Sequence, residues 1–233
     1  FSNARVLLAA YTQFGEAFVD HINGSFAAAI WRVREQTLLL VTDQIGTHPL
    51  YYAQVGDRLV FASGARAVAQ MPDLPRGVEV AAIAELVAYE QVFGDKTLFA
   101  GVRLLPAGIV ARFQGGVLHT TRYVDYQHPE YYAPQSEDEV VEQWAYVMRQ
   151  AVARQARGPA PLGVLLTGGF DSRSILASMD RQAIDVVSLT FGVEGCDDLR
   201  IAREVARVLS VPHHYIPLPP DFLDGRASCR ERV

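Results

Sequence analysis

The chain has 233 residues, half of them hydrophobic, so it is long and apolar enough to bury a substantial core. Its formal net charge is -5, and its lysines and arginines are scattered, which argues against a nucleic-acid surface and a basic membrane-binding face. No apolar run approaches the roughly 18 residues of a membrane span, and no charged-then-apolar leader opens the chain. We therefore expect a small-molecule ligand.

The cysteines and the chain ends add three expectations. Cys196 and Cys229 lie far apart and have no CxxC partner, so they indicate neither a disulfide framework nor a zinc site, and a reducing, cytoplasmic setting fits them. The chain opens on Phe1 rather than Met, so we expect a piece of a longer protein. Residues 224–233 are polar, rich in arginine and without periodicity, and predict a truncated C-terminus.

The first 125 residues predict an antiparallel sheet with helices packed against it, an α+β arrangement. Apolar residues recur at helical spacing over residues 4–18, and a second helix is expected over residues 80–91. Strand-like runs on both sides of short polar turns predict three hairpins. They pair residues 24–33 with 36–43, residues 49–54 with 58–63, and residues 109–113 with 117–123.

The pattern changes after a polar, Tyr- and Pro-rich segment at residues 126–139, which predicts a linker and a domain boundary between residues 127 and 128. A helix follows, and Ser136 with Glu139 predicts a capping box in front of it. Strands and helices then alternate. The strands are expected over residues 162–166, 184–191 and 213–218, and the helices over residues 172–182 and 197–209. Because the strands are continuously apolar, this alternation predicts an α/β domain whose parallel sheet is covered on both faces.

The loop Thr167-Gly-Gly-Phe-Asp-Ser172 follows the first of these strands, at the sheet edge where α/β proteins bind ligands. Gly168 and Gly169 remove side chains that would keep an anion from the backbone N–H groups, and the helix start adds a positive dipole end. The hydroxyls of Thr167 and Ser172 can bind phosphate oxygens. Asp171 would repel phosphate unless a divalent cation lay between them, so it is the candidate Mg²⁺ ligand.

A purely structural interpretation of the same loop stays open. In it, Gly168 and Gly169 make a tight turn, while Asp171 and Ser172 cap the helix that follows. The loop is neither a Walker loop, since the GxxxxGK[ST] pattern is absent, nor a GxGxxG fingerprint.

The segment LLTGGFDSR resembles the S-G-G-x-D-S pyrophosphate loop of the ATP-pyrophosphatase enzymes, with Thr167 in place of the usual first Ser. Residues 186–215 are similar to the asparagine synthetase pattern of a strand, F-x-x-G, an acidic pair, D-L-x-x-A-x-x-V-A-x-x-L and a His-containing strand. Upstream, GSFAAAIWR, TDQIGTHPLYY, LVFASGARAV and LPAGIVARF look like the second half of a class II glutaminase domain. These motifs, which follow one another in this order over nearly the whole chain, thus resemble the glutamine-hydrolysing asparagine synthetases.

This resemblance implies two incomplete domains. Residues 1–127 would be the C-terminal part of a class II glutamine amidotransferase domain with an Ntn-hydrolase-like αββα fold. Residues 128–233 would be the N-terminal part of an ATP-pyrophosphatase domain with an adenine nucleotide alpha hydrolase-like fold. The family uses ATP, Mg²⁺ and L-glutamine as the ammonia donor, and it forms an amide from aspartate through an acyl-adenylate. A homodimer is one of the oligomeric states left open.

The resemblance also assigns the nucleotide-binding residues. Thr167, Gly168, Gly169 and Ser172 would hold the pyrophosphate, and Asp171 its Mg²⁺. Leu165 and Phe191 match positions that contact the adenine ring in the family. For Phe191, stacking on the base and a role in the core of a strand both stay open.

The glutaminase half departs from the family pattern. The family's nucleophile is an N-terminal Cys, and Phe1 offers none. Asn3 and Arg5 stand where the family's S-D-x-E motif has an Asp that binds the amino group of glutamine and a Glu. An amide at Asn3 attracts an ammonium group less, and Arg5 repels it. Asp43 matches a family Asp, but a structural turn role is the preferred interpretation.

Two further groups of residues are weaker candidates. His213 and His214 point to opposite faces of a strand, which argues against joint metal binding. Asp197 and Asp198 would form an acidic patch near the nucleotide or favour a helix N-terminus. Related synthetases that close β-lactam or lasso-peptide amide bonds, and a degenerate nucleotide-binding protein, stay open as alternative functions. From these 233 residues alone we predict no turnover, because the family's later catalytic motifs do not occur in them.

Overall fold

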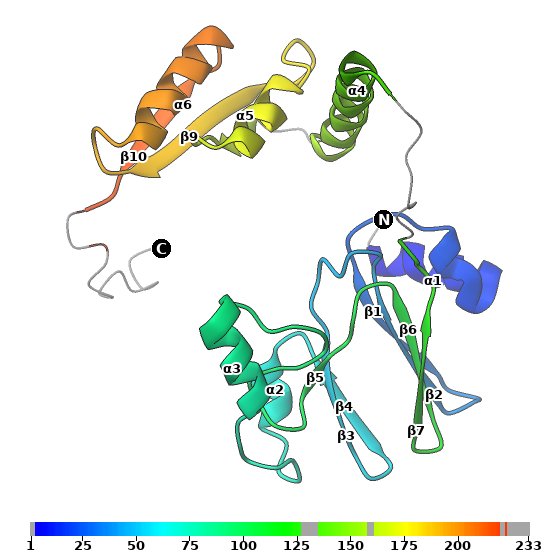
Figure 1. Cartoon of the computed structure of the whole chain (residues 1–233). Coiled ribbons are helices and arrows are strands. Elements are labelled where there is room, and N and C mark those ends of the chain that lie inside the picture. Colours follow the sequence, from blue (N-terminus) through cyan, green and yellow to red (C-terminus); the bar gives the residue numbers. More distant parts are fainter. Residues whose placement is uncertain (1–2, 127–134, 158–160, 220–221, 223–233) are drawn as a thin grey trace. The chain divides into compact units, whose positions relative to one another are not determined.

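The structure is a computed structural model that describes residues 3–126, 135–157, 161–219 and 222. The chain divides into two compact units, Phe1–Pro129 and Glu130–Val233, which are described separately (Figure 1). Phe1, most of the linker segment and the C-terminal residues 223–233, including Cys229, lie outside the described residues. In the described part of the chain, no helix is both long and apolar enough to cross a membrane.

A four-stranded antiparallel sheet forms the centre of the first unit, in the order β1-β2-β6-β7. Its strands are β1 (Ala27–Arg32), β2 (Thr37–Thr42), β6 (Ile109–Gln114) and β7 (Val117–Arg122). The helix α1 (Asn3–Phe14) ends earlier than predicted and continues as the 3-10 helix η1 (Gly15–Asp20). Gly15 has a φ of 60°, which an α-helix cannot accommodate, so the helix breaks there.

A second antiparallel sheet, in the order β4-β3-β5, packs against the first. It contains β3 (Tyr51–Val55), β4 (Arg58–Ala62) and β5 (Arg103–Leu104). Two helices, α2 (Ala65–Ala69) and α3 (Val80–Tyr89), lie between β4 and β5 in the chain. The three predicted hairpins are confirmed, and the predicted helix over 80–91 ends at Tyr89, before Glu90, whose backbone is left-handed.

The side chains of the first unit form a core on each face of the central sheet. Val41 and Val110 pack against Phe18 of η1, while Leu40 and Ala111 on the opposite face pack against Leu50 beside the second sheet. A third cluster joins α2 to the outer face of β3. The layers therefore run helix, sheet, sheet, helix, with α1 and α2 on the outside (Figure 1).

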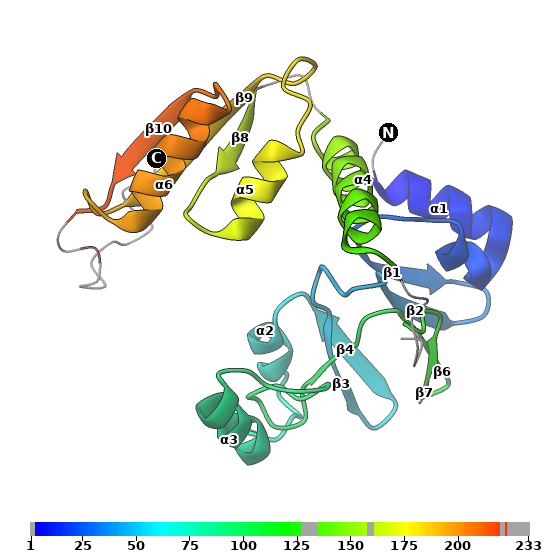
Figure 2. The same cartoon turned by 45° about the horizontal axis from the view of Figure 1, so that its top comes forward.

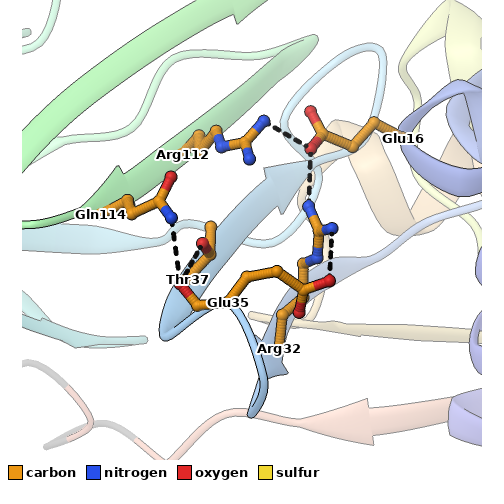
Figure 3. A network of polar contacts seen from close by, with 6 residues as sticks. All are labelled: Glu16, Arg32, Glu35, Thr37, Arg112 and Gln114. Atoms are coloured by element: carbon orange, nitrogen blue, oxygen red, sulfur yellow. Dashed lines mark hydrogen bonds and ion pairs between the residues drawn. The ribbon is translucent and has the colours of Figure 1, made fainter.

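A polar network joins η1 to strands β1 and β6 of the central sheet (Figure 3). Glu16 Oε1 accepts hydrogen bonds from Arg32 Nη1 at 3.4 Å and from Arg112 Nη1 at 3.1 Å. Gln114 Nε2 donates to the carbonyl of Glu35 at 3.0 Å. These side chains are partly exposed, so each ion pair contributes little and the core carries most of the stability.

The second unit is built on a parallel sheet in the order β10-β9-β8, which confirms the predicted α/β alternation. Its elements are α4 (Glu137–Gln155), β8 (Leu162–Leu165), α5 (Phe170–Ala177), β9 (Val186–Gly192), α6 (Asp197–Val208) and β10 (His213–Pro217). The capping box in front of α4 is also confirmed, because the Ser136 hydroxyl accepts from the Glu139 amide and the Glu139 carboxylate accepts from the Ser136 amide.

The prediction that both faces of this sheet are covered is wrong for the described residues. Val164, Leu166 and Val186 on one face share a buried cluster with residues of α4, α5 and α6. On the other face, Leu165 and Phe191 are 59% and 54% exposed. The strands follow chain order, so both right-handed crossovers place their helices on one side (Figure 1 and Figure 2).

Candidate functional site

The loop between β8 and α5 starts from a fixed point at the carboxyl end of the parallel sheet. The amide of Leu166 donates to the carbonyl of Leu189 at 2.8 Å, and the buried hydroxyl of Thr190 donates to the carbonyl of Leu166 at 2.6 Å. Leu166 itself is fully buried. The residues that follow therefore leave the core at a defined place, where parallel sheets bind ligands.

Two hydroxyl groups close the base of the loop. Ser172 Oγ accepts a hydrogen bond from the amide of Thr167 at 3.1 Å and lies 3.1 Å from Thr167 Oγ1. Thr167 Oγ1 in turn accepts from the amide of Gly169 at 3.1 Å. A hydroxyl at both positions therefore shapes the loop as well as offering donors to a ligand.

The start of α5 is open to an anion. Its N-cap residue is Gly169, which has no side chain to accept from the first amides of the helix. Such first-turn N–H groups have no partner within a helix, and the helix dipole adds positive potential there. The interpretation in which Asp171 and Ser172 cap a helix starting at residue 172 is wrong, because α5 starts at Phe170 and no side chain caps it.

Gly168 also makes a contact that was not predicted. Its N–H group donates to Asp198 Oδ1 of α6 at 2.8 Å. A Cβ atom at residue 168 would lie 2.9 Å from the same oxygen and 3.0 Å from Ile201 Cδ1. The glycine thus admits the start of α6, and the sequence carries no signal for this contact across 30 residues.

Leu165 and Phe191 lie on the same exposed face of the sheet. Leu165 pairs with Leu189 in the register of β8 and β9, and Phe191 follows two residues later on β9. Both side chains are more than half exposed at the end of the sheet from which the loop emerges. An apolar surface therefore adjoins the loop, as a flat ring such as a nucleobase requires.

Arg173 brings a positive charge to the loop. Its Nε atom donates to the carbonyl of Gly169 at 3.2 Å, and its guanidinium carbon lies 5.9 Å from the centre of the Phe170 ring. The side chain is therefore held beside the start of α5 by a hydrogen bond and a cation–π contact.

Asp171 is the acidic residue of the loop, and it can hold a metal ion only together with a bound ligand. Within the ranges that the structure describes, no three His, Cys, Asp or Glu side chains converge on a possible metal position. Asp171 is exposed in the first turn of α5. Because Mg²⁺ in nucleotide sites takes one or two carboxylates and completes its shell with phosphate oxygens and water, a single Asp fits a metal shared with phosphate.

The two histidines have separate environments. Nδ1 of His213 lies 3.0 Å from the hydroxyl of the buried Ser188, on the neighbouring strand β9. Burial, and then the charge of Arg203, hold the pKa of His213 below its ordinary value. His214 is exposed. His213 is therefore a packed residue of the sheet.

Asp43 has a structural role in the first unit. It is 1% exposed, and its carboxylate accepts from the amides of Phe26, Ile45 and Thr47 at 3.0 to 3.1 Å. Burial acts to raise the pKa of Asp43, but these hydrogen bonds outweigh it and the pKa lies below the ordinary value. Asn3 is the first residue of α1 and its side chain lies outside the described residues, while Arg5 is exposed.

Comparison with known proteins gives the family. The family model of a glutamine amidotransferase domain matches residues 1–124, and that of asparagine synthase matches residues 143–225. The chain belongs to the glutamine-hydrolysing asparagine synthetase family. The matches cover both units in the order predicted from the sequence motifs.

Curated relatives of this family are similar to the chain over most of its length. It is 28% identical over 177 residues to asparagine synthetase [glutamine-hydrolyzing] 3 of Bacillus subtilis, which is 76% of the chain and 28% of that protein. It is 27% identical over 215 residues to asparagine synthetase [glutamine-hydrolyzing] 1 of the same organism, 90% of the chain and 33% of that protein. It is 24% identical over 245 residues to amidase chyE of Penicillium rubens, 97% of the chain and 36% of that protein. The chain thus spans about a third of the length of these relatives.

The asparagine synthetase motifs come together in the second unit. Thr167, Gly169 and Ser172 form one hydrogen-bonded loop, with Asp171 on the first turn behind it. Asp198 joins this loop, whereas Asp197 pairs with Arg200 at 3.0 Å. The two acids of one sequence pair therefore have different contacts.

Proposed function

We propose that the protein is an ATP-dependent ligase that forms an amide through an acyl-adenylate, converting aspartate to asparagine with ammonia from glutamine. The observation that carries this proposal is the loop of residues 167–172, which joins a hydroxyl pair, an uncapped helix start and one exposed carboxylate at the end of a parallel sheet. It falls within the part of the chain that matches asparagine synthase.

In the proposed reaction, a carboxylate oxygen of the substrate attacks the α-phosphorus of ATP. The bond from that phosphorus to the oxygen bridging the α- and β-phosphates breaks, and pyrophosphate leaves with the bonding electrons. The first-turn N–H groups of α5 and the hydroxyls of Thr167 and Ser172 would stabilise the charge on this leaving group. Bound Mg²⁺ would neutralise phosphate charge, and Asp171 is the residue that would hold it.

The adenine ring would lie on the exposed apolar face beside the loop. Leu165 and Phe191 both reach that face at the carboxyl end of their strands. The contact would bury apolar surface that water covers in the free protein, and an aromatic ring at Phe191 can stack on the base.

Ammonia would come from glutamine at the first unit. We propose that residues 1–127 are the C-terminal part of a class II glutamine amidotransferase domain and that residues 128–233 are the N-terminal part of an ATP-pyrophosphatase domain. The helix, sheet, sheet, helix layering supports an Ntn-hydrolase-like fold for the first, and the sheet order β10-β9-β8 with its loop supports an adenine nucleotide alpha hydrolase-like fold for the second. Ammonia would attack the acyl carbon, and AMP would leave.

The proposal also covers the surroundings of the reaction. The ligands are ATP, Mg²⁺, L-glutamine and a carboxylic acid, with neither nucleic acid nor membrane as a partner and a homodimer as an open arrangement. We propose the cytoplasm as the compartment, and the free thiol of Cys196 suits its reducing conditions.

A second candidate keeps the adenylation but changes the substrate. Two relatives that match 97% of the chain, at 24% and 25% identity, are named amidases rather than asparagine synthetases. In this candidate the glutaminase part does not function, as Asn3 and Arg5 suggest, and the acceptor is another carboxylic acid.

The test uses the intact natural protein with ATP, Mg²⁺, a panel of carboxylic acids and either glutamine or ammonium. The first candidate predicts asparagine from aspartate with glutamine, and equal amounts of AMP and pyrophosphate. The second candidate is supported if the amide forms with ammonium but not with glutamine, or if it forms from an acid other than aspartate. Formation of ADP and phosphate would contradict both, and no nucleotide turnover with any acid would indicate a degenerate nucleotide-binding protein.

A further inference from the structure

The contact between Asp198 and Gly168 joins the loop to a helix that the phosphate-binding motif does not include. Asp198 is the second residue of α6, which lies between β9 and β10. Its Oδ1 atom accepts from the Gly168 amide at 2.8 Å. A hydrogen bond from an amide to a carboxylate is stronger than one to a neutral acceptor, so this contact constrains the loop.

The contact restrains the most flexible part of the loop. Two consecutive glycines lose more conformational freedom on ordering than any other pair of residues. Leu166 is fixed before them by Thr190, and Ser172 is fixed after them by Thr167. Between these points the Gly169 amide donates to Thr167 Oγ1 within the loop, and Asp198 holds Gly168 and sets the loop relative to α6.

The Asp198 carboxylate could have a second role. It could occupy the Gly168 amide only until a phosphate oxygen of the ligand displaces it. The packing around Gly168 argues against this role. A Cβ atom there would lie 3.0 Å from Ile201 Cδ1 and 3.5 Å from Asp198 Cα, so helix α6 already fills that side of the residue. The N–H group of Gly168 therefore faces α6, and the N–H groups at the start of α5 are the ones left for phosphate.

We propose that Asp198 is a positioning residue, which holds Gly168 so that the loop is already ordered when pyrophosphate binds. This inference rests on the proposed function, because it assigns the loop to pyrophosphate. It requires a hydrogen-bond acceptor at residue 198 but not a negative charge. Asp197, which pairs with Arg200, has no part in it.

Steady-state exchange of labelled pyrophosphate into ATP tests the role in the intact protein with Mg²⁺ and the acid substrate. We expect Asp198→Ala to raise the KM for ATP and for pyrophosphate by about tenfold, since one charge-assisted hydrogen bond is lost, with kcat changed less than the KM. Asp198→Asn keeps an acceptor oxygen and should restore most of this loss. Asp197→Ala is the adjacent control and should leave both KM values near those of the wild type.

Two outcomes of this exchange assay would overturn the proposal. If Asp198→Ala lowered the KM for pyrophosphate, the carboxylate would be a competitor of phosphate. If Asp198→Asn were as damaging as Asp198→Ala, the charge itself would be needed, as for a metal ligand.

Amide hydrogen exchange at Gly168, measured without nucleotide, separates this inference from the proposed function. The wild type, Asp198→Asn and Asp197→Ala should protect the Gly168 amide, and Asp198→Ala should lose the protection. Equal protection in Asp198→Ala would show that the contact does not order the loop and would overturn the inference, even in an active enzyme. If Asp198→Ala lost the protection of the Gly168 amide as expected, but the wild type turned over no ATP, the proposed function would be refuted. The role of Asp198 toward pyrophosphate would be refuted with it.

Discussion

The Ser172 hydroxyl accepts a hydrogen bond from the amide of Thr167 at 3.1 Å, so the last residue of the loop holds the first. Ser172→Ala removes this acceptor and leaves the amide without it. We expect the KM for ATP to rise by roughly tenfold, which corresponds to one hydrogen bond of about 1.4 kcal/mol. Ser174→Ala, two residues further along α5, is the control. Equal KM values for the two variants would refute the role of the hydroxyl pair.

Gly168→Ala tests how closely α6 approaches the loop. The new methyl group would lie 2.9 Å from Asp198 Oδ1 and 3.0 Å from Ile201 Cδ1, so these two side chains of α6 have to move away from the loop. We expect the free energy of unfolding of the second unit to fall by about 1–3 kcal/mol. Urea unfolding followed by the fluorescence of Trp144, with Trp31→Phe to remove the other tryptophan, measures it.

The control for this variant is Gly24→Ala in the first unit, where a Cβ atom meets no other atom within 4 Å, and the fluorescence of Trp31 follows its unfolding. Its urea midpoint should stay unchanged. If Gly168→Ala behaved in the same way, the start of α6 would not lie against the loop.

Asp43 should make the first unit sensitive to acid. Its folded pKa lies below the ordinary value of 3.8, so its stabilising effect is complete above that pH and is lost as the pH falls through the folded pKa. Asp43→Asn should lower the free energy of unfolding by about 2–3 kcal/mol at pH 7, because three backbone amides lose a charged acceptor that is itself buried. The difference from the wild type should narrow below about pH 4.

Fluorescence of Trp31 in a Trp144→Phe background follows unfolding of this unit, and the exposed Asp57→Asn serves as the control. A difference between wild type and Asp43→Asn that stayed constant from pH 7 to pH 3 would contradict the depressed pKa.

Much of the fold could be predicted because its signals are local. Alternating apolar residues around short polar turns gave the hairpins, and the Ser136 and Glu139 pair gave the start of α4. The helix α2 and the strand β5 were missed, since five and two residues are too few for periodicity to show. The continuously apolar strands predicted a sheet covered on both faces. An apolar strand shows that a face can be covered, but it does not show which segment of the chain covers it.

In the candidate site, too, the local features could be predicted and the long-range contact could not. The residues of the loop are contiguous, so the motif revealed Thr167, Asp171 and Ser172 together. The bond from Gly168 to Asp198 spans 30 residues and depends on how α6 packs, which no local pattern encodes. The expectation that both glycines serve the ligand therefore stays a prediction, with the contact to Asp198 added to it.

Phe191 should contribute to the binding of the nucleobase and not to the binding of the phosphates. Phe191→Ala removes the exposed ring beside the loop, and we expect the Kd for ATP to rise by about tenfold, as stacking on one base contributes roughly 1–3 kcal/mol. The Kd for pyrophosphate should stay unchanged. Isothermal titration of the intact protein with each ligand measures both values.

The control for the base contact is Val208→Ala, an apolar residue on α6 that is also more than half exposed. A parallel rise in the two Kd values of Phe191→Ala would mean that the ring supports the loop rather than the base.

The exchange of labelled pyrophosphate into ATP by the intact protein, with Mg²⁺ and its acid substrate, tests most directly whether loop 167–172 binds the pyrophosphate of ATP. We expect exchange by the wild type and by Asp180→Asn, an exposed control just after α5. Asp171→Asn should reduce it by roughly 100-fold or more, because the metal-binding carboxylate at the leaving group is lost. Undiminished exchange in Asp171→Asn, or exchange absent from the wild type with every acid, would contradict the assignment of this loop.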